Sequence, residues 1–397
     1  MTEVVRIEAV DSRARGLRGR RAEERFGGLA LVRRLDLLLL GSVLASVVYG
    51  LVVIGGITKL APGGSAETRQ AVYAVVGIVA MCAAIFVDPA LYRRFASVMY
   101  AGLLGVMLLV LATGAVTRGS KRWITVGGFT FQPSEFGKVL LALCLAAFVA
   151  DRVKKMHDLT LALRATALAA GPIVLVFLQP DFGSALVYGA VLAAVLFVSG
   201  IRWSTLAAIG GVAVFVAAAV LWWLPAAGVN VLRPYQAARL TGFTHPGSDP
   251  SSATYQVTQS ITTVGAGGLR GRGVVGATQT SLGYLPEDST DFAFASLSEQ
   301  RGFFGASILL LLYLLIVWRG LRIVASAGDL FGAIVAASIS FAFLFEVFIN
   351  VGMTIGVAPI TGITLPFVSV GGSSMISNLG AMGILQAIHA RGRRRRS

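Results

Sequence analysis

The chain has 397 residues, of which 56% are hydrophobic and only 13% are charged, with a formal net charge of +15. No soluble domain is that apolar along its whole length, so the composition predicts a polytopic membrane protein. The basic residues stand in short clusters between apolar segments, without the aromatic and basic stretches that stack nucleobases. This pattern argues against nucleic-acid binding and favours attraction to anionic lipid.

Residues 1–34 are rich in arginine and mixed in charge, and we expect them to form a disordered cytoplasmic tail. Apolar segments long enough to cross a bilayer, about 17–25 residues each, then follow one another. They lie at about 36–58, 71–87, 95–114, 134–150, 160–178, 182–200, 204–224, 303–318, 329–350 and 372–390. The sequence therefore predicts an all-α polytopic membrane protein, with about ten transmembrane helices in one domain over 35–390 and a basic cytoplasmic tail at 391–397.

The basic clusters orient these segments, because cytoplasmic loops carry an excess of lysine and arginine. The clusters that agree with one another are Arg33–Arg34, Arg93–Arg94, Arg152 to Lys155, Arg202, Arg319 to Arg322 and the arginines of 391–396. We therefore expect a multi-pass protein of the cytoplasmic (inner) membrane with both termini in the cytoplasm. The large polar loop at 225–290, between spans seven and eight, then lies outside.

One short loop on the external side breaks this pattern, since it contains Arg118, Lys121 and Arg122. Either the neighbouring spans override the signal, or the loop binds an anion. After Pro133, which suits the first turn of a helix, Glu135 and Lys138 stand three residues apart on one face and can pair. The sequence leaves open whether they form a buried ion pair or line a polar cavity.

Asp181 follows a proline between two spans, where it either caps the next helix or faces the same cavity. The polar loop contains a glycine run with Arg270 and Arg272. No βαβ unit surrounds this run, so it is not a dinucleotide fingerprint. Its arginines either hold a phosphate together with backbone amides or belong to a flexible basic loop at the lipid surface.

Asp291 ends the polar loop directly before the next apolar segment. A carboxylate at the edge of the hydrocarbon is costly, so Asp291 is a candidate functional residue. Farther along, 350–374 contains many Gly, Pro and hydroxyl residues at membrane depth, among them Ser373 and Ser374. This composition predicts a broken helix that protein buries or that lines a wet cavity.

Taken together, these motifs resemble the SEDS family (shape, elongation, division and sporulation), which includes RodA and FtsW. The matching stretches run in order from roughly 36 to 390: Arg122-Trp123-Ile124, Phe131 to Glu135 with Lys138, Gln179-Pro180-Asp181, Tyr235-Gln236 with Arg239, Tyr255-Gln256, Leu285-Pro286-Glu287 to Thr290-Asp291-Phe292, and Leu365 to Ser369 with Gly371 to Ser374. As a set they are specific, although each alone is weak. One departure is Val370, where the family usually has Tyr, and it puts one cavity contact in doubt.

The resemblance implies a peptidoglycan glycosyltransferase that polymerises lipid II outside the membrane, with a class B penicillin-binding transpeptidase as its partner. The segments 352–356 and 359–363 are more similar to the elongation branch, RodA, than to the division branch, FtsW. An α-linked lipid diphosphate donor and a β-linked product imply single displacement with inversion, in which Asp291 is the general base. The substrate-binding residues would be Arg122, Trp123, Glu135, Lys138, Asp181, Arg239, Arg272, Ser373 and Ser374, and the cations among them would stabilise the leaving diphosphate.

No cofactor is certain. The sequence leaves open whether a divalent cation such as Mg²⁺ shares this stabilisation with Glu135 or Asp181. A lipid II flippase is the main alternative, because a broken helix and intramembrane charges also suit transport. The charges concentrate on the external half, however, whereas a flippase needs a polar path through both leaflets. A third alternative is a non-catalytic scaffold for the transpeptidase, in which Asp291 would be replaceable.

Overall fold

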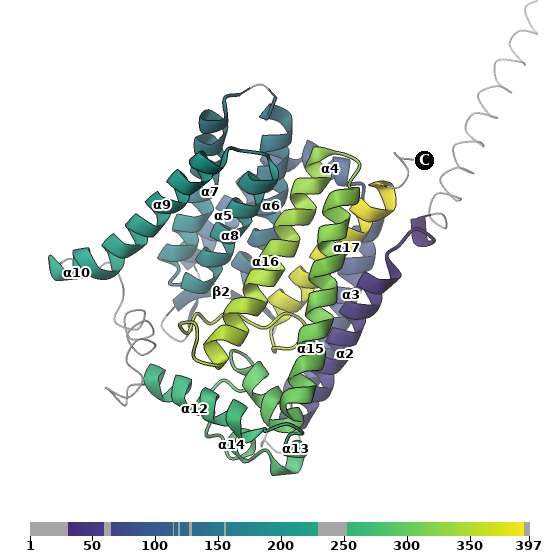
Figure 1. Ribbon diagram of the computed structural model, residues 1–397, viewed down its shortest axis with the longest axis vertical. Coiled ribbons are helices and arrows are strands. Elements are labelled where there is room, and N and C mark those ends of the chain that lie inside the picture. The colour runs from purple at the N-terminus through teal and green to yellow at the C-terminus, as the bar shows by residue number, and fades with distance from the viewer. Residues whose placement is uncertain are drawn as a thin grey trace, which may run out of the picture.

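The computed structural model describes residues 31–58, 65–113, 115–117, 120–126, 129–154, 156–228 and 252–392 (Figure 1). Its principal helices form a bundle along the long axis of the molecule. They are α2 (Leu37–Thr58), α3 (Ser65–Phe86), α5 (Ala96–Thr113), α6 (Pro133–Arg152), α7 (Asp158–Leu178), α8 (Phe182–Val198), α9 (Trp203–Ala218), α15 (Ala293–Ser326), α16 (Leu330–Thr354) and α17 (Gly372–Gly392). Each coincides with one of the apolar segments predicted from the sequence.

The fold is that of an all-α, multi-pass membrane protein. Within the described residues, seven helices are long and apolar enough to cross a membrane, and α8 and α9 are shorter apolar helices. The count of ten spans therefore stays a prediction. The remaining helical elements are short: α4 (Pro89–Arg94), the π-helical turn η1 (Ala219–Trp223), α10 (Leu224–Ala226), α12 (Ser252–Ala266), α13 (Gly273–Gly276) and α14 (Thr278–Ser281).

A small antiparallel sheet, which the sequence did not predict, stands between α5 and α6. It consists of β1 (Ala115–Thr117), β2 (Ser120–Val126) and β3 (Phe129–Phe131) in the order β1-β2-β3. Thr125 of β2 pairs with Thr130 of β3. The sheet leads the chain directly into α6, whose first residue is Pro133, as the proline predicts.

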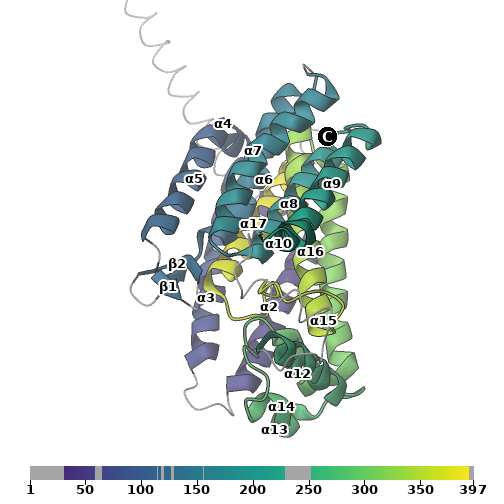
Figure 2. The same cartoon turned by 90° about the vertical axis from the view of Figure 1, so that its left-hand side faces the viewer.

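The bundle is held together by a few extensive helix pairs. Helix α17 packs along α3, α15 lies between α2 and α16, and α16 also packs against α8. The close approach of α17 to α3 needs a glycine, since a Cβ on Gly383 would lie 2.4 Å from the Met81 carbonyl oxygen. By contrast α9 and α10 project from the bundle (Figures 1 and 2), and most side chains of α9 are exposed, as a helix facing lipid allows.

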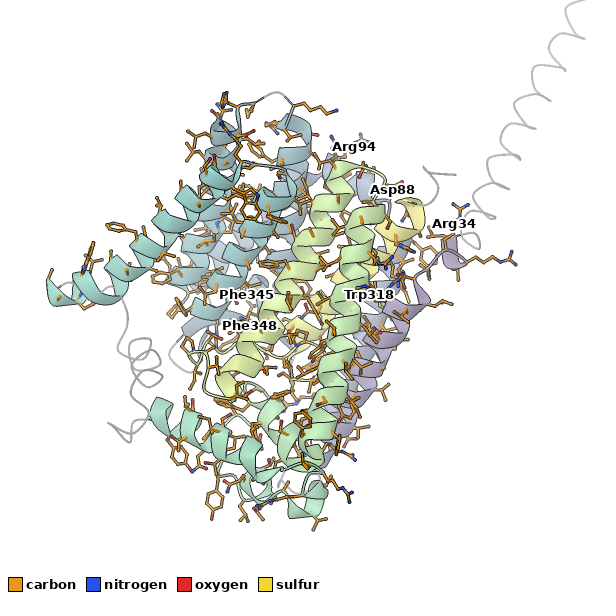
Figure 3. The ribbon with its side chains drawn as sticks, viewed as in Figure 1. Arg34, Asp88, Arg94, Trp318, Phe345 and Phe348 are labelled. Atoms are coloured by element: carbon orange, nitrogen blue, oxygen red, sulfur yellow. The ribbon has the colours of Figure 1, made fainter. Side chains whose placement is uncertain are left out.

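Charged residues of the segments that connect the helices gather at one end of the bundle. Arg34, Asp88 and Arg94 lie at one end, while exposed Trp318 and Phe348 lie along the side (Figure 3). The polar segment with α12, α13 and α14 lies at the opposite end (Figures 1 and 2). The charge pattern predicts this separation, and which end faces the cytoplasm stays a prediction.

Helix α15 begins ten residues before the predicted apolar segment and contains a break at Gly302, with φ +67° and ψ −166°. A Cβ on Gly302 would lie 2.2 Å from the backbone nitrogen of Gly271, so two segments of backbone pass in contact there. Except for Arg301, the residues of 293–301 are buried by protein. The break therefore separates a lipid-facing helix from a short helical segment that belongs to the polar end of the molecule.

Candidate active site

Asp181 caps the next helix, which is one of the two roles that the sequence left open, and it is also the centre of a buried polar network. Its Oδ1 accepts the Ser184 N–H at 3.2 Å and so caps α8. Its Oδ2 accepts from Gln132 Nε2 at 2.9 Å, from the Ser134 hydroxyl at 3.0 Å and from the Ser184 hydroxyl at 2.8 Å. Arg122 Nη1 lies 3.6 Å from Oδ1, and the carboxylate is only 3% exposed. The negative charge is therefore compensated inside the bundle by an arginine and a set of donors.

Arg122 is held in place by the sheet and by its neighbour Trp123. The guanidinium lies 4.2 Å from the centroid of the Trp123 ring, which is a cation–π contact. The indole Nε1 donates to Gln132 Oε1 at 3.1 Å. The buried Nε of Arg122 has no hydrogen-bond partner among the described residues. The guanidinium therefore keeps donor capacity for an anion, since an arginine carries five N–H groups.

Glu135 and Lys138 pair as their spacing predicts, and the structure adds a third group. Lys138 Nζ donates to Glu135 Oε2 at 2.8 Å and also to Glu346 Oε1 on α16. The Lys138 side chain is 7% exposed and that of Glu346 is 4% exposed. The buried ion pair is thus the arrangement observed, and two carboxylates surround the ammonium.

Glu346 is not among the residues predicted from the sequence, although a signal for it was present. It is the only charged residue in the 25 residues of α16. An ionisable group inside a transmembrane segment is a functional candidate by default, because leaving it unpaired in hydrocarbon is expensive. The same rule that singled out Asp291 would therefore have found Glu346.

Ser373 and Ser374 connect the first turn of α17 to both sides of this region. Ser373 Oγ accepts the Gln132 backbone N–H at 2.9 Å and donates to the Thr130 carbonyl at 3.2 Å. Ser374 Oγ accepts from the Thr364 hydroxyl at 2.8 Å. The hydroxyls thereby hold the sheet and the start of α6 against α17.

The loop that ends at Asp291 is attached to the segment between α16 and α17. Asn350 Nδ2 donates to the Asp291 carbonyl at 3.0 Å, the Ser369 hydroxyl donates to the Thr290 carbonyl at 2.5 Å, and the Val370 N–H donates to the Ser289 carbonyl at 2.8 Å. No regular helix is assigned between residues 355 and 371, which confirms the predicted interruption. Val370 makes its contact through the backbone, so that contact does not require a tyrosine.

The loop before Asp291 concentrates acidic groups in a partly buried position. The Thr290 hydroxyl donates to Glu287 Oε2 at 2.8 Å. Burial raises the pKa of Asp288 above its ordinary value of 3.8, the charge of Glu287 adds to this, and hydrogen bonds from Ser289 oppose it. Asp291 itself is half-buried, and the residues after it, from Phe292 onward, are buried. The predicted apolar flank of Asp291 is therefore confirmed.

The predicted binding residue Arg272 lies apart from these groups. Arg272 is exposed, and its Nε donates to the Ala266 carbonyl at 2.8 Å. It caps α13 at the far end of the molecule, away from β2 in both views (Figures 1 and 2). Arg239, with Tyr235 and Gln236, lies outside the described residues. The network thus brings together Arg122, Trp123, Asp181 and the serines of α17, and it reaches the Asp291 loop through 363–370.

The described residues contain no group of three or more His, Cys, Asp or Glu that could hold a metal ion. The carboxylate of Asp181 accepts from protein donors at both oxygens, and Glu135 binds an ammonium. This donor set does not fit a divalent cation, so we derive no catalytic step through one.

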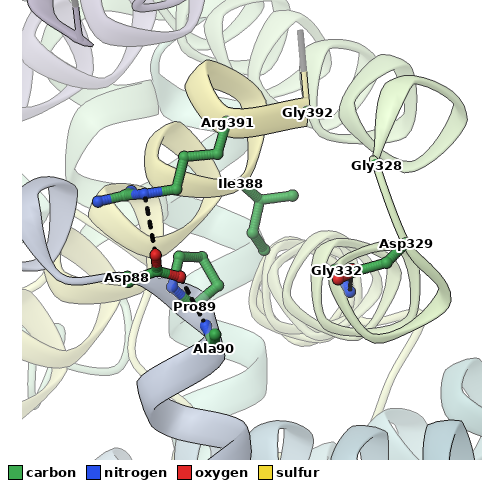
Figure 4. Close-up of a pocket in the computed structure, with 9 residues that line it drawn as sticks. All are labelled: Asp88, Pro89, Ala90, Gly328, Asp329, Gly332, Ile388, Arg391 and Gly392. Carbon is green, nitrogen blue, oxygen red and sulfur yellow. Dashed lines mark hydrogen bonds and ion pairs between the residues drawn. The ribbon is translucent and has the colours of Figure 1, made fainter. Parts of the chain in front are cut away.

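A pocket of about 400 Å³ lies at the other end of the bundle and contains none of the predicted site residues (Figure 4). Arg391 Nε lies 4.0 Å from Asp88 Oδ2, and Arg391 also donates to the Ile85 carbonyl at 3.1 Å. Asp88 and Asp329 on its wall cap α4 and α16. These two carboxylates accept hydrogen bonds from the first turns of their helices. The pocket is separate from the network around Asp181.

Comparison with known proteins places this geometry in a family. The family model described as a cell cycle protein, FtsW/RodA/SpoVE, matches residues 32–394. The chain is 36% identical over 320 residues to the stage V sporulation protein E of Bacillus subtilis, covering 80% of this chain and 85% of that protein. It is also 36% identical over 360 residues to the peptidoglycan glycosyltransferase MrdB of Escherichia coli K12, covering 89% and 93%.

Solved structures agree with these relatives. A chain of a peptidoglycan synthase complex superposes with a TM-score of 0.76 at 29% identity, covering 90% of this chain and 98% of the other. The rod shape determining protein RodA of Thermus thermophilus superposes with a TM-score of 0.65 at 27% identity, covering 89% and 96%. The chain therefore belongs to the FtsW/RodA/SpoVE family of cell cycle proteins.

Proposed function

We propose that this protein is an inverting peptidoglycan glycosyltransferase that polymerises lipid II into glycan strands. One observation carries the assignment. The loop of Asp291 is hydrogen-bonded to Asn350 and to the segment 363–370. Helix α17 follows that segment, and its Ser373 is hydrogen-bonded to Gln132, which in turn donates to Asp181. A base and an anion-binding group are thereby held on one connected polar framework. The relatives named as peptidoglycan glycosyltransferases support the same chemistry.

In the proposed reaction Asp291 takes the proton from the acceptor sugar hydroxyl as that oxygen attacks the anomeric carbon of the donor. The bond from this carbon to the diphosphate breaks, and the diphosphate leaves as an anion. A positioned base contributes about 10²–10⁴ in rate. The lipid tail of the donor stays in the bilayer, so the polyprenyl chain would lie along the apolar spans.

Arg122 is the residue best placed to stabilise the leaving diphosphate. Asp181 and the Trp123 ring hold its guanidinium, and its buried Nε is not used by the described protein groups. Lys138 is hydrogen-bonded to two carboxylates, so we assign it a structural role inside the bundle, where it supports the cluster of Arg122 and Asp181. Ser373 and Ser374 hold this cluster in a fixed position relative to the Asp291 loop through their hydrogen bonds to Gln132 and Thr364.

The cellular role follows from the branch of the family and from the topology. We place the chain in elongation and shape maintenance because 352–356 and 359–363 resemble RodA, although FtsW proteins are also among its relatives at 35% identity. The neighbour in a peptidoglycan synthase complex supports a penicillin-binding partner, which we propose to be a class B transpeptidase. Both termini would lie in the cytoplasm and the site would lie outside the inner membrane.

The test is lipid II polymerisation by the purified protein, alone and with its transpeptidase, comparing wild type with Asp291→Asn. A matched control is Asp288→Asn, which removes a second half-buried carboxylate from the same loop. We expect Asp291→Asn to lose at least about 100-fold and Asp288→Asn to stay within a few-fold of wild type. Polymer from Asp291→Asn at the wild-type rate would remove Asp291 from the chemistry. No polymer from the wild type, together with lipid II translocation in vesicles, would establish the flippase instead.

A further inference from the structure

The cluster of Glu135, Lys138 and Glu346 has one negative charge more than it has positive charge. Among the described residues, Lys138 is the only cation bonded to it, and it donates to both carboxylates. The three side chains are 12%, 7% and 4% exposed, so water does not surround the excess charge. A buried charge that is not matched by a counter-charge is strongly disfavoured.

No other ionisable side chain on the packed elements balances this excess. The neighbouring cation Arg122 is paired with Asp181. Helix α8 contributes Tyr188, whose hydroxyl donates to the Ser134 carbonyl, and α15 contributes Tyr313, whose hydroxyl donates to the Pro366 carbonyl. Helix α17 contributes Asn378, whose amide interacts with the Glu346 carboxyl but carries no charge that could balance it. Glu346 is itself the only charged residue of α16.

The surroundings of Glu346 distinguish its two oxygens. Oε1 accepts from Lys138, whereas the fully buried Oε2 has no hydrogen-bond partner among the described residues. A cavity of about 10 Å³ adjoins this carboxyl and is lined by Lys138, Ser338 and Asn378 among others. That volume suits at most a single water molecule, and although most of the lining is apolar, Lys138, Ser338, Glu346 and Asn378 contribute polar groups to it.

We propose that the cluster binds one proton in addition to those of the lysine ammonium, and that this proton resides on Glu346. Protonation makes the cluster neutral, and it turns Oε2 from an unsatisfied acceptor into a donor toward the water-sized cavity. Glu346 takes the proton rather than Glu135 because it is the deeper of the two carboxyls. The proton comes from solvent, and no other bond forms or breaks.

Infrared spectroscopy of the purified protein in lipid nanodiscs tests the site directly, because a protonated carboxyl has a C=O stretch separate from that of a carboxylate. Wild type should show this band, and in Glu346→Gln the band should lose the intensity that corresponds to one protonated carboxyl group. Glu135→Gln should lose the same intensity, because one ammonium and one carboxylate then balance and Glu346 has no reason to hold a proton. This second variant also carries the test if Glu346→Gln does not fold.

Glu299→Gln is the matched control, since Glu299 is a buried glutamate of another helix and has no ion pair within the described part of the chain. Its carboxylate accepts from the backbone N–H groups of Gln279 and Thr280, at 2.8 and 3.0 Å, and from the Thr280 hydroxyl at 2.7 Å. These hydrogen bonds are to Gln279 and Thr280 and not to the cluster, so we expect the control to keep the band that Glu346 contributes. Absence of the band in wild type, or its full persistence in Glu135→Gln, would overturn the proposal. The measurement uses no substrate, so it stands or falls independently of the polymerase assignment.

Discussion

Replacing Asp181 by alanine tests whether the polar network around it holds the bundle together. The change leaves Arg122 as a buried cation without its carboxylate, and it leaves the Gln132 amide and the Ser134 and Ser184 hydroxyls without their acceptor. It also removes the side-chain cap of α8. The damage therefore combines an orphaned charge with the loss of several hydrogen bonds.

The expected loss follows from the burial of the pair. Breaking a buried ion pair by removing one partner costs about 3–5 kcal/mol, because the other charge stays desolvated. A cap adds about 1 kcal/mol, although the two terms share the same carboxylate and do not simply add. The matched control is Asp158→Ala, which breaks an ion pair with Arg202 whose partners are 62% and 40% exposed. An exposed pair of this kind contributes about 0–1 kcal/mol.

Denaturant unfolding of the purified protein in detergent micelles, followed by tryptophan fluorescence, measures both losses. We expect Asp181→Ala to lose several times more free energy of unfolding than Asp158→Ala. Adding Arg122→Met to Asp181→Ala should restore part of the loss, because it removes the orphaned charge. If Asp181→Ala lies within about 1 kcal/mol of wild type, or equals the control, the network does not carry the stability assigned to it.

Two further predictions concern the loops near the site. In α2, Gly50→Ala places a Cβ 2.4 Å from the Phe367 carbonyl oxygen, whereas Gly41→Ala in the same helix meets nothing within 4 Å. Thermal unfolding should therefore show a loss of about 1–3 kcal/mol for Gly50→Ala, and equal stability of the two variants would contradict the close approach. The second prediction concerns Asp288, whose pKa is raised by burial. Between pH 3.8 and this raised pKa, Asp288 binds more protons in the folded protein than in the unfolded chain. The stability of the protein should therefore fall as pH rises through that range. Melting midpoints across pH should lose this component of the slope in Asp288→Asn, and an unchanged slope would refute the assignment.

The local sequence pattern is sufficient to locate some elements of the fold and not others. The apolar segments were located well because partition into a bilayer depends on the composition of the segment itself. The helical residues 293–301, before the break at Gly302, lie outside the predicted apolar segment, because they are buried by protein rather than by lipid and need not be continuously apolar. The strands β1 and β3 have three residues each, and such strands form only when a partner strand supplies their hydrogen bonds.

By itself the sequence determined the class of protein, the order of its membrane segments and the polar residues worth attention, since each of these depends on residues close together in the chain. Only the tertiary structure decided which polar groups meet. Arg122, Asp181 and Ser373 come from a sheet and two helices that are far apart in sequence, and Glu346 joins Lys138 across more than two hundred residues. These contacts arise because charges buried in a bilayer must find partners, and only the packing of α6, α8, α16 and α17 determines which partners are within reach.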